Sequence, residues 1–156
     1  MVTPREFLIR RPRKAEASQV VALMLALWPD EGPAAFPHDL VKLRNHVCDG
    51  PKGVLFVAEG EGALQGFVAV GIREWSDSGD SSPIPHVEGW FVTKRYRRIG
   101  VGRALLRAAE DWARKKGFTE IGSDTWESNT TSIRAHHAAG FRTRERIVYF
   151  GKRLKP

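Results

Sequence analysis

Cysteine is nearly absent from this chain of 156 residues, which carries one thiol, Cys48. A single cysteine excludes an internal disulfide and any metal site built from several thiolates, so we expect no metal centre. The chain also lacks an apolar run near the ~20 residues that span a bilayer. Residues 1–7 contain no apolar core of a signal peptide. We therefore expect a cytoplasmic protein without a membrane partner.

Acidic residues are fewer than basic ones, 18 against 25, which gives a net charge of +7. Basic proteins often bind nucleic acids. Single-strand binding, however, uses aromatic residues among the basic ones, and Tyr96 alone fits that pattern. We expect no nucleic-acid partner, although a basic nucleic-acid-binding module remains an alternative. The length corresponds to one domain over residues 1–156, large enough to bury a core.

Lysine and arginine are missing from three segments, residues 28–41, 74–93 and 117–133. These segments hold ten of the 18 acidic residues: Asp30, Glu31, Asp39, Glu74, Asp77, Asp80, Glu88, Glu120, Asp124 and Glu127. If the segments converge in the fold, they form an anionic pocket suited to a cation. The alternative is that polar loops carry these acids by chance.

Apolar periodicity predicts strands that alternate with helices. The predicted strands are 7–11, 54–58, 64–72, 86–92, 118–124 and 147–152. The predicted helices are 16–28, 38–48, 101–116 and a last one that Asn129 or Thr130 caps and that ends at residue 139. Such a mixture indicates an α/β sheet covered on both faces.

A glycine-rich turn joins the strand at 86–92 to the helix at 101–116 and reads Arg97-x-x-Gly100-x-Gly102. A turn of this kind leaves backbone N–H groups unpaired at a helix N-terminus, where the helix dipole also favours an anion. Glycine lets a phosphate approach the backbone. The spacing does not match the dinucleotide fingerprint or the P-loop. The alternative is an ordinary turn with a solvated, basic face.

This motif and its flanks resemble those of the GCN5-related N-acetyltransferase (GNAT) superfamily. The resemblance implies a GNAT fold, in which a central mixed, mostly antiparallel sheet is flanked by helices in a single α/β domain. It also implies acetyl-coenzyme A as the co-substrate. The implied contacts to it are Trp90, Phe91, Val92, Arg97, Arg98, Ile99, Gly100, Val101, Gly102, Arg103 and Asn129.

Within the superfamily, the chain is similar to the aminoglycoside 6'-N-acetyltransferases. The similarity is carried by Asp80-Ser81-Ser82-Pro83, Glu88-Gly89, Ser123-Asp124 and Glu145-Arg146, among other pieces. It implies transfer of acetyl to the 6'-amino group of a polycationic antibiotic by a homodimer. The implied acceptor contacts are Trp28, Glu31, Trp75, Glu88, Asp124 and Glu145. Trp75 and Trp90 depart from the tyrosine and the aliphatic residue common in that family.

Acetyl transfer to an amine requires a neutral amine, a polarised carbonyl and a leaving thiolate. We expect Glu88 to attract the ammonium group and accept its proton, directly or through water, with Asp124 beside it. The alternative is that Glu88 is structural and paired with an arginine. Backbone N–H groups near Trp90 and Phe91, splayed by a bulge, would meet the oxyanion.

His136 lies where relatives often have a tyrosine that is thought to protonate the leaving thiolate. Its role is either this general-acid step or only a hydrogen bond near the coenzyme sulfur. An alternative function remains open, that of an acetyltransferase for a protein N-terminus or another cellular amine.

Overall fold

The computed structural model describes residues 6–156, which form two compact units: one that ends at Asp124 and one that begins at Thr125. The prediction of one domain over the whole chain stays a prediction. Among the described residues, no helix combines the length and the apolar character needed to cross a bilayer.

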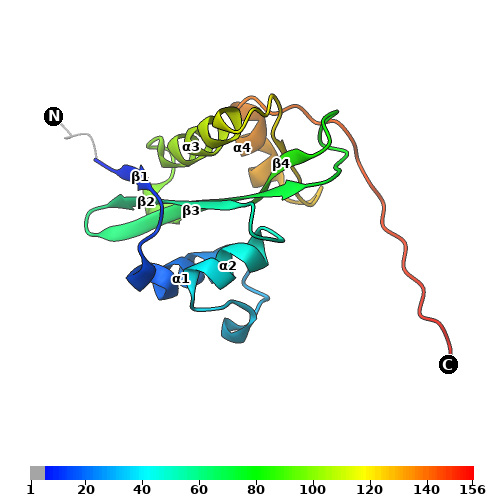
Figure 1. The fold of residues 1–156 in the computed structure, drawn as a ribbon, viewed down its shortest axis with the longest axis horizontal. Helices are drawn as coiled ribbons and strands as arrows, with labels where there is room; N and C mark the ends of the chain where they lie inside the picture. Colours follow the sequence, from blue (N-terminus) through cyan, green and yellow to red (C-terminus); the bar gives the residue numbers. More distant parts are fainter. Residues whose placement is uncertain (1–5) are drawn as a thin grey trace. The chain divides into compact units, whose positions relative to one another are not determined.

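The first unit is built on a sheet in which each strand neighbours the next one along the chain. The strands are β1 (Leu8–Arg10), β2 (Val54–Gly60), β3 (Ala63–Arg73), β4 (Ile84–Val92) and β5 (Gly122–Ser123). The first four pair antiparallel, and β5 pairs parallel with β4. This confirms the predicted mixed, mostly antiparallel sheet (Figure 1).

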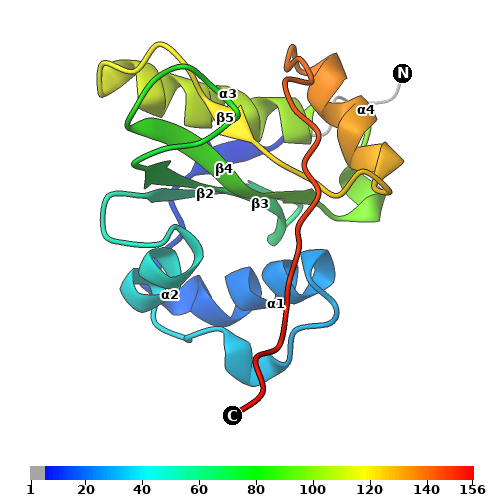
Figure 2. The same cartoon turned by 90° about the vertical axis from the view of Figure 1, so that its right-hand side faces the viewer.

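Helices cover both faces of this sheet, as Figures 1 and 2 show. Helices α1 (Ala17–Leu27) and α2 (Leu40–Val47) pack on one face, and α3 (Val101–Lys115) packs on the other. Short 3-10 helices precede α1 (Lys14–Glu16), α2 (Pro33–Ala35) and α3 (Lys94–Tyr96). Because both faces are covered, the middle strands are apolar almost throughout, and eight consecutive residues of β3 are buried.

The apolar stripe of α3 fixes how this helix meets the sheet. Val101, Leu105, Ala109 and Trp112 are buried, while Arg103 and Arg107 on the opposite side are exposed. This is the spacing of one helix face, so the predicted helix and its inward side are confirmed.

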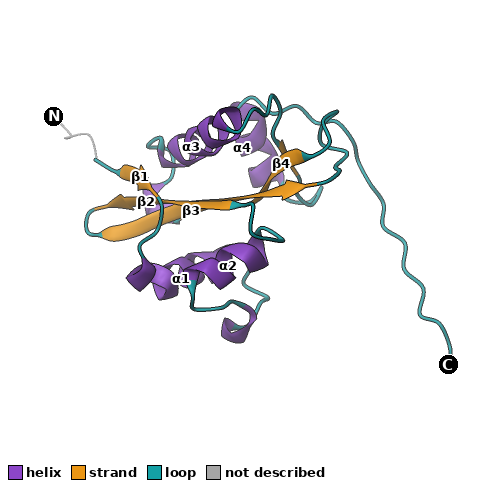
Figure 3. Cartoon of the chain, in the orientation of Figure 1, coloured by secondary structure: helices purple, strands orange, loops and turns teal. Residues whose placement is uncertain are grey.

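The second unit contains helix α4 (Thr130–Ala138), and Asn129 caps it by accepting from the N–H of Ser132 at 3.1 Å. The predicted strand at 147–152 is wrong, because residues 141–156 have no secondary structure (Figure 3). A strand depends on a neighbour for its hydrogen bonds, and no described strand pairs with these residues. Their apolar side chains are therefore exposed, up to 94% for Phe150.

Strand β5 is also shorter than the predicted strand at 118–124. It pairs with β4 only where Gly122 faces His86 and Ser123 faces Val87. Beyond Val87, β4 therefore continues without β5 as a paired neighbour.

An ion cluster ties the start of the first unit to its sheet. The Arg10 guanidinium donates to both carboxylate oxygens of Glu16, at 2.6 and 2.9 Å, and to Glu59 at 2.8 Å. The hydrogen bond from Arg10 lowers the pKa of Glu16 to about 2, against the opposing effect of burial. Glu16 is nearly buried, so its charge depends on these partners.

We expect Glu16→Gln to lower the free energy of unfolding by about 1–3 kcal/mol at pH 7, because Arg10 loses a charged partner. The folded-state pKa of Glu16 is depressed from its ordinary 4.5, so its stabilisation is present above pH 4.5 and is lost as the pH falls towards 2. The difference from wild type should therefore shrink at pH 3. Urea denaturation at both pH values measures it. Glu110→Gln, which removes an exposed pair with Arg114, is the control and should change little.

Candidate active site

A β-bulge in β4 places Glu88. Val70 of β3 pairs with Val87 and Ala69 pairs with Gly89, which leaves Glu88 as the extra residue between them. The bulge was expected near Trp90 and Phe91, and that position is wrong, since both residues pair in regular register with β3. The register shift occurs two residues before Trp90, at Glu88.

Two glycines near the bulge, Gly71 of β3 and Gly89 of β4, make room for the Glu88 carboxylate and the side chains around it. A Cβ at Gly71 would lie 2.6 Å from the carbonyl oxygen of Cys48 and 3.2 Å from Oε1 of Glu88. A Cβ at Gly89 would lie 2.8 Å from the indole of Trp28. The close approach of these groups therefore requires glycine at both positions.

Arg73, the last residue of β3, binds the Glu88 carboxylate with both arms of its guanidinium. Nε donates to Oε1 at 2.9 Å and Nη2 donates to Oε2 at 2.8 Å. The remaining nitrogen, Nη1, donates to Asp124 at 3.5 Å. Two carboxylates that were predicted to converge thus share one guanidinium.

His86 lies beneath the same carboxylates and is fully buried. Its Nδ1 is 3.5 Å from Glu88 and its Nε2 is 3.6 Å from Asp124, and neither ring nitrogen has a hydrogen bond among the described residues. Burial raises the pKa of Glu88, but the hydrogen-bonded Arg73 guanidinium and the nearby His86 ring outweigh it and lower that pKa to about 2. Glu88 is therefore ionised at neutral pH.

Sequence reasoning missed both His86 and Arg73. Residues two apart in a strand share a face, so the spacing of His86 from Glu88 was an available signal. Arg73 had no local signal, because its contact with Glu88 depends on the pairing of β3 with β4.

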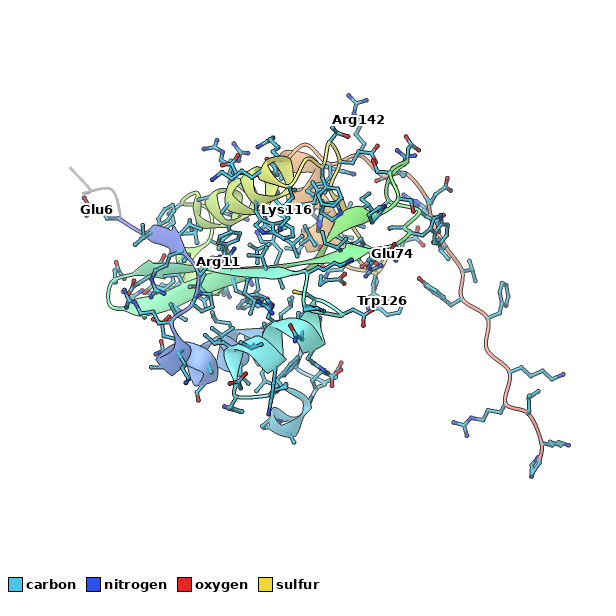
Figure 4. All side chains as sticks on the ribbon, viewed as in Figure 1. Glu6, Arg11, Glu74, Lys116, Trp126 and Arg142 are labelled. Carbon is cyan, nitrogen blue, oxygen red and sulfur yellow. The ribbon has the colours of Figure 1, made fainter. Side chains whose placement is uncertain are left out.

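A cavity of about 600 Å³ opens beside Glu88 and Arg73. Asp49, Glu74 and Trp75 also line it, and Figure 4 labels Glu74 just beyond the end of β3. Lys52 lines it too, so basic as well as acidic side chains border the cavity. Of the three segments without basic residues, only 74–93 lines this cavity, and the acid of segment 117–133 that reaches Glu88 is Asp124, through Arg73.

The predicted acceptor contacts of the first unit differ in their surroundings. Trp28 is partly buried and stacks on Phe36 with ring centroids 5.9 Å apart, so it contributes to the core as well as bordering Gly89. Trp75 is 69% exposed at the cavity. Glu31 is exposed in the turn after α1, and no described contact joins its carboxylate to Glu88.

Cys48 also lines the cavity but has little reactivity. Its thiol is buried, and burial, aided by the charge of Glu88, raises its pKa to about 12. A thiol that stays protonated at neutral pH is a poor nucleophile.

The glycine-rich turn has the backbone that its sequence predicted. Arg98 and Gly100 have positive φ angles of 62° and 92°, and Gly100 is the N-cap of α3. Around an added Cβ at Gly100 there is open space within 4 Å. The first amides of α3 lie directly after this open turn, and a helix start has no internal acceptors for them. A pyrophosphate such as that of coenzyme A fits these features.

Aromatic and arginine contacts hold the turn against the end of β4. Nε1 of Trp90 donates to the carbonyl of Gly102 at 3.0 Å. Nε of Arg97 donates to the carbonyl of Val92 at 2.7 Å, and its guanidinium lies 5.5 Å from the centre of the Phe91 ring. Arg97 thus braces the turn, whereas Ile99 and Arg103 are exposed beside it.

Three predicted site residues lie in the second unit and are described within it. The Asn129 side chain is used as the cap of α4. Nδ1 of His136 is 2.7 Å from the carbonyl oxygen of Ser132, so this nitrogen donates, and the ring packs edge-on against Phe141. Glu145 is exposed. The roles of these three residues stay predictions.

The features of the first unit define a class of enzyme that transfers an acyl group from coenzyme A. The family model described as the Acetyltransferase (GNAT) family matches residues 20–141. The chain belongs to this family.

The most similar relatives include two enzymes called aminoglycoside N(6')-acetyltransferase type 1. The one from Stenotrophomonas maltophilia is 35% identical over 95% of this chain and 94% of its own length. The one from Klebsiella aerogenes is 33% identical over 94% of this chain and 97% of its own. Among solved structures, AAC(6')-Iy in complex with the bisubstrate analogue CoA-S-monomethyl-acetylneamine has a TM-score of 0.82 at 32% identity, covering 96% of this chain and 99% of that one.

We expect Gly100→Val to weaken the binding of acetyl-coenzyme A at least tenfold, because a β-branched residue resists a φ of 92° and fills the open space at the turn. Titration calorimetry measures the affinity. Gly117→Val is the matched control, since Gly117 has a φ of 87° and open space at the other end of α3. Both variants should lose similar stability, and only Gly100→Val should lose coenzyme affinity. Equal affinities in the two variants would remove the turn from the site.

Proposed function

We propose that this protein is an aminoglycoside 6'-N-acetyltransferase, which transfers acetyl from acetyl-coenzyme A to the 6'-amino group of the antibiotic. The observation that carries the proposal is the position of Glu88. It stands in a bulge of the strand that leads into the coenzyme turn, with Asp124 within reach of the same guanidinium. The full-length similarity to enzymes of that name supports the same substrate class.

The residues of this chain supply charge and position to the reaction. Acetyl-coenzyme A supplies the activated acetyl group when bound. Glu88 and Asp124 attract the ammonium group of the acceptor, and Trp75, exposed at the cavity, offers a flat apolar surface to a sugar ring. Glu88 then holds the proton that the amine gives up, directly or through water. With a pKa near 2, Glu88 is a weak base while Arg73 binds it, so its charge and position matter first.

An acetylation assay tests the function. Release of the coenzyme A thiol is followed with kanamycin-type aminoglycosides, spermidine and a peptide with a free N-terminus as acceptors, and the product is located by NMR. Acetyl at the 6' nitrogen is the expected result. Turnover of the peptide or of spermidine in preference to every aminoglycoside would favour the other reading, an acetyltransferase for a protein N-terminus or a cellular amine.

We expect Glu88→Gln to lower kcat by about 10²–10⁴-fold at neutral pH, because the amine loses its counter-charge and proton acceptor. Raising the pH should restore part of the rate, since more of the amine is then neutral. Profiles of kcat against pH for the two enzymes make the comparison. Profiles of the same height and shape would leave Glu88 a structural residue.

Asp124→Asn is the companion variant, because Asp124 is exposed and holds the acceptor in this proposal. The substitution should raise the KM for the acceptor more than it lowers kcat. Binding of acetyl-coenzyme A should be unchanged in both variants.

The proposal includes a homodimer. The apolar side chains of Ile147, Val148, Tyr149 and Phe150 are 54–94% exposed in a single chain, which is an apolar surface that a second copy can cover. Sedimentation velocity should show a dimer for the wild type and a monomer for a variant with Val148 and Phe150 changed to serine. A wild-type monomer at micromolar concentration would exclude it.

We also infer a cytoplasmic location. The use of acetyl-coenzyme A, a metabolite of the cytoplasm, and the single protonated thiol of Cys48 support it. Fractionation of the producing cells tests it, with recovery in the periplasm as the contrary result.

A further inference from the structure

The two carboxylates proposed to bind the acceptor already hold a cation that belongs to the chain. The Arg73 guanidinium makes two hydrogen bonds of 2.8 and 2.9 Å to Glu88 and a longer one of 3.5 Å to Asp124. A guanidinium that bridges two carboxylates in this way occupies the space and the charge that an ammonium group would need.

The Glu88–Asp124 pair has one fixed and one exchangeable partner. The His86 side chain is 1% exposed and approaches both carboxylates from the buried side, at 3.5 and 3.6 Å. Arg73 approaches from the solvent side, where its side chain is 37% exposed. A long side chain with this exposure leaves its partner at modest cost, because water replaces the lost hydrogen bonds. The buried His86 side chain cannot move away from the carboxylates in this way.

We propose that Arg73 is an internal stand-in for the acceptor's ammonium group, and that a cationic acceptor displaces it from Glu88 and Asp124. This inference rests on the proposed function, and it makes Arg73 a specificity-determining residue. An acceptor must carry enough positive charge to replace a bidentate guanidinium, so a singly charged amine competes poorly and a polycation competes well.

The structure provides a place for the displaced side chain. Arg73 lines the cavity of about 600 Å³ together with Asp49 and Glu74, whose carboxylates can receive the guanidinium. Departure of Arg73 also affects the chemistry. Arg73 is one of the groups that lower the pKa of Glu88, so its departure lets Glu88 hold the proton better once the amine has given that proton up.

Arg73→Gln tests the proposal, because glutamine keeps a polar side chain and removes the competing charge. Affinities for a kanamycin-type aminoglycoside and for spermidine are measured by titration calorimetry in the presence of coenzyme A. We expect Arg73→Gln to bind both polycations about fivefold more tightly than wild type. Arg73→Lys, which keeps the charge, should stay within about twofold of wild type.

Arg114→Gln is the matched control, since it removes the same charge from a residue paired with Glu110 and Asp111 on α3. It should leave both affinities unchanged, which separates competition at Glu88 from a general change in net charge. Thermal melting confirms that each variant is folded.

Kinetics distinguish competition from a purely structural role. A competitor's removal lowers the acceptor KM, whereas loss of a group that only positions Glu88 raises KM and lowers kcat. Affinity for both polycations that is unchanged or weaker in folded Arg73→Gln would overturn the proposal. Failure of the wild type to acetylate any aminoglycoside would instead remove the proposed function, and the spermidine titration would still decide whether Arg73 competes.

Discussion

The register shift between β3 and β4 is the constraint on which the site depends. It turns Glu88 into the unpaired residue of a bulge and aligns the end of β3, with Arg73, against the start of β4. Without the shift, residues 88–92 would occupy different faces of the sheet, since a one-residue slip reverses every side chain. The carboxylate, its guanidinium partner and the buried imidazole of His86 all take their positions from this one irregularity.

The same strand connects the two halves of the chemistry. Its first part carries the buried His86 and, at the cavity, Glu88, and its last part carries Trp90 and Val92, whose contacts hold the glycine-rich turn. Because β5 accompanies β4 only as far as Val87, the later residues of β4 pair with β3 alone. A coenzyme at the helix start and an amine at Glu88 would therefore meet along one strand.

Charge in this protein is arranged in compensated groups. Arg10 offsets Glu16 and Glu59, and Arg73 offsets Glu88 and Asp124. The first group has low exposure and stabilises the fold. The second is more exposed and borders a cavity, which is where exchange with a charged ligand costs least. The net charge of the chain says little about either group, because each includes a pair that is distant in sequence, Arg10–Glu59 in the first and Arg73–Asp124 in the second.

Most of the strands, the helices and the glycine-rich turn could be predicted from the sequence, since these depend on local periodicity and on glycine at Gly100. The sequence also determined the family and that Glu88 is a carboxylate in an apolar strand. The position of the bulge at Glu88, the approach of His86 and Arg73 to it, and the two-residue length of β5 could not be predicted in this way. These features depend on strand register and on pairs such as Arg73 and Asp124, 51 positions apart. The strand expected at 147–152 is absent from the structure for a related reason. An apolar segment becomes a strand only when a neighbouring strand accepts its hydrogen bonds.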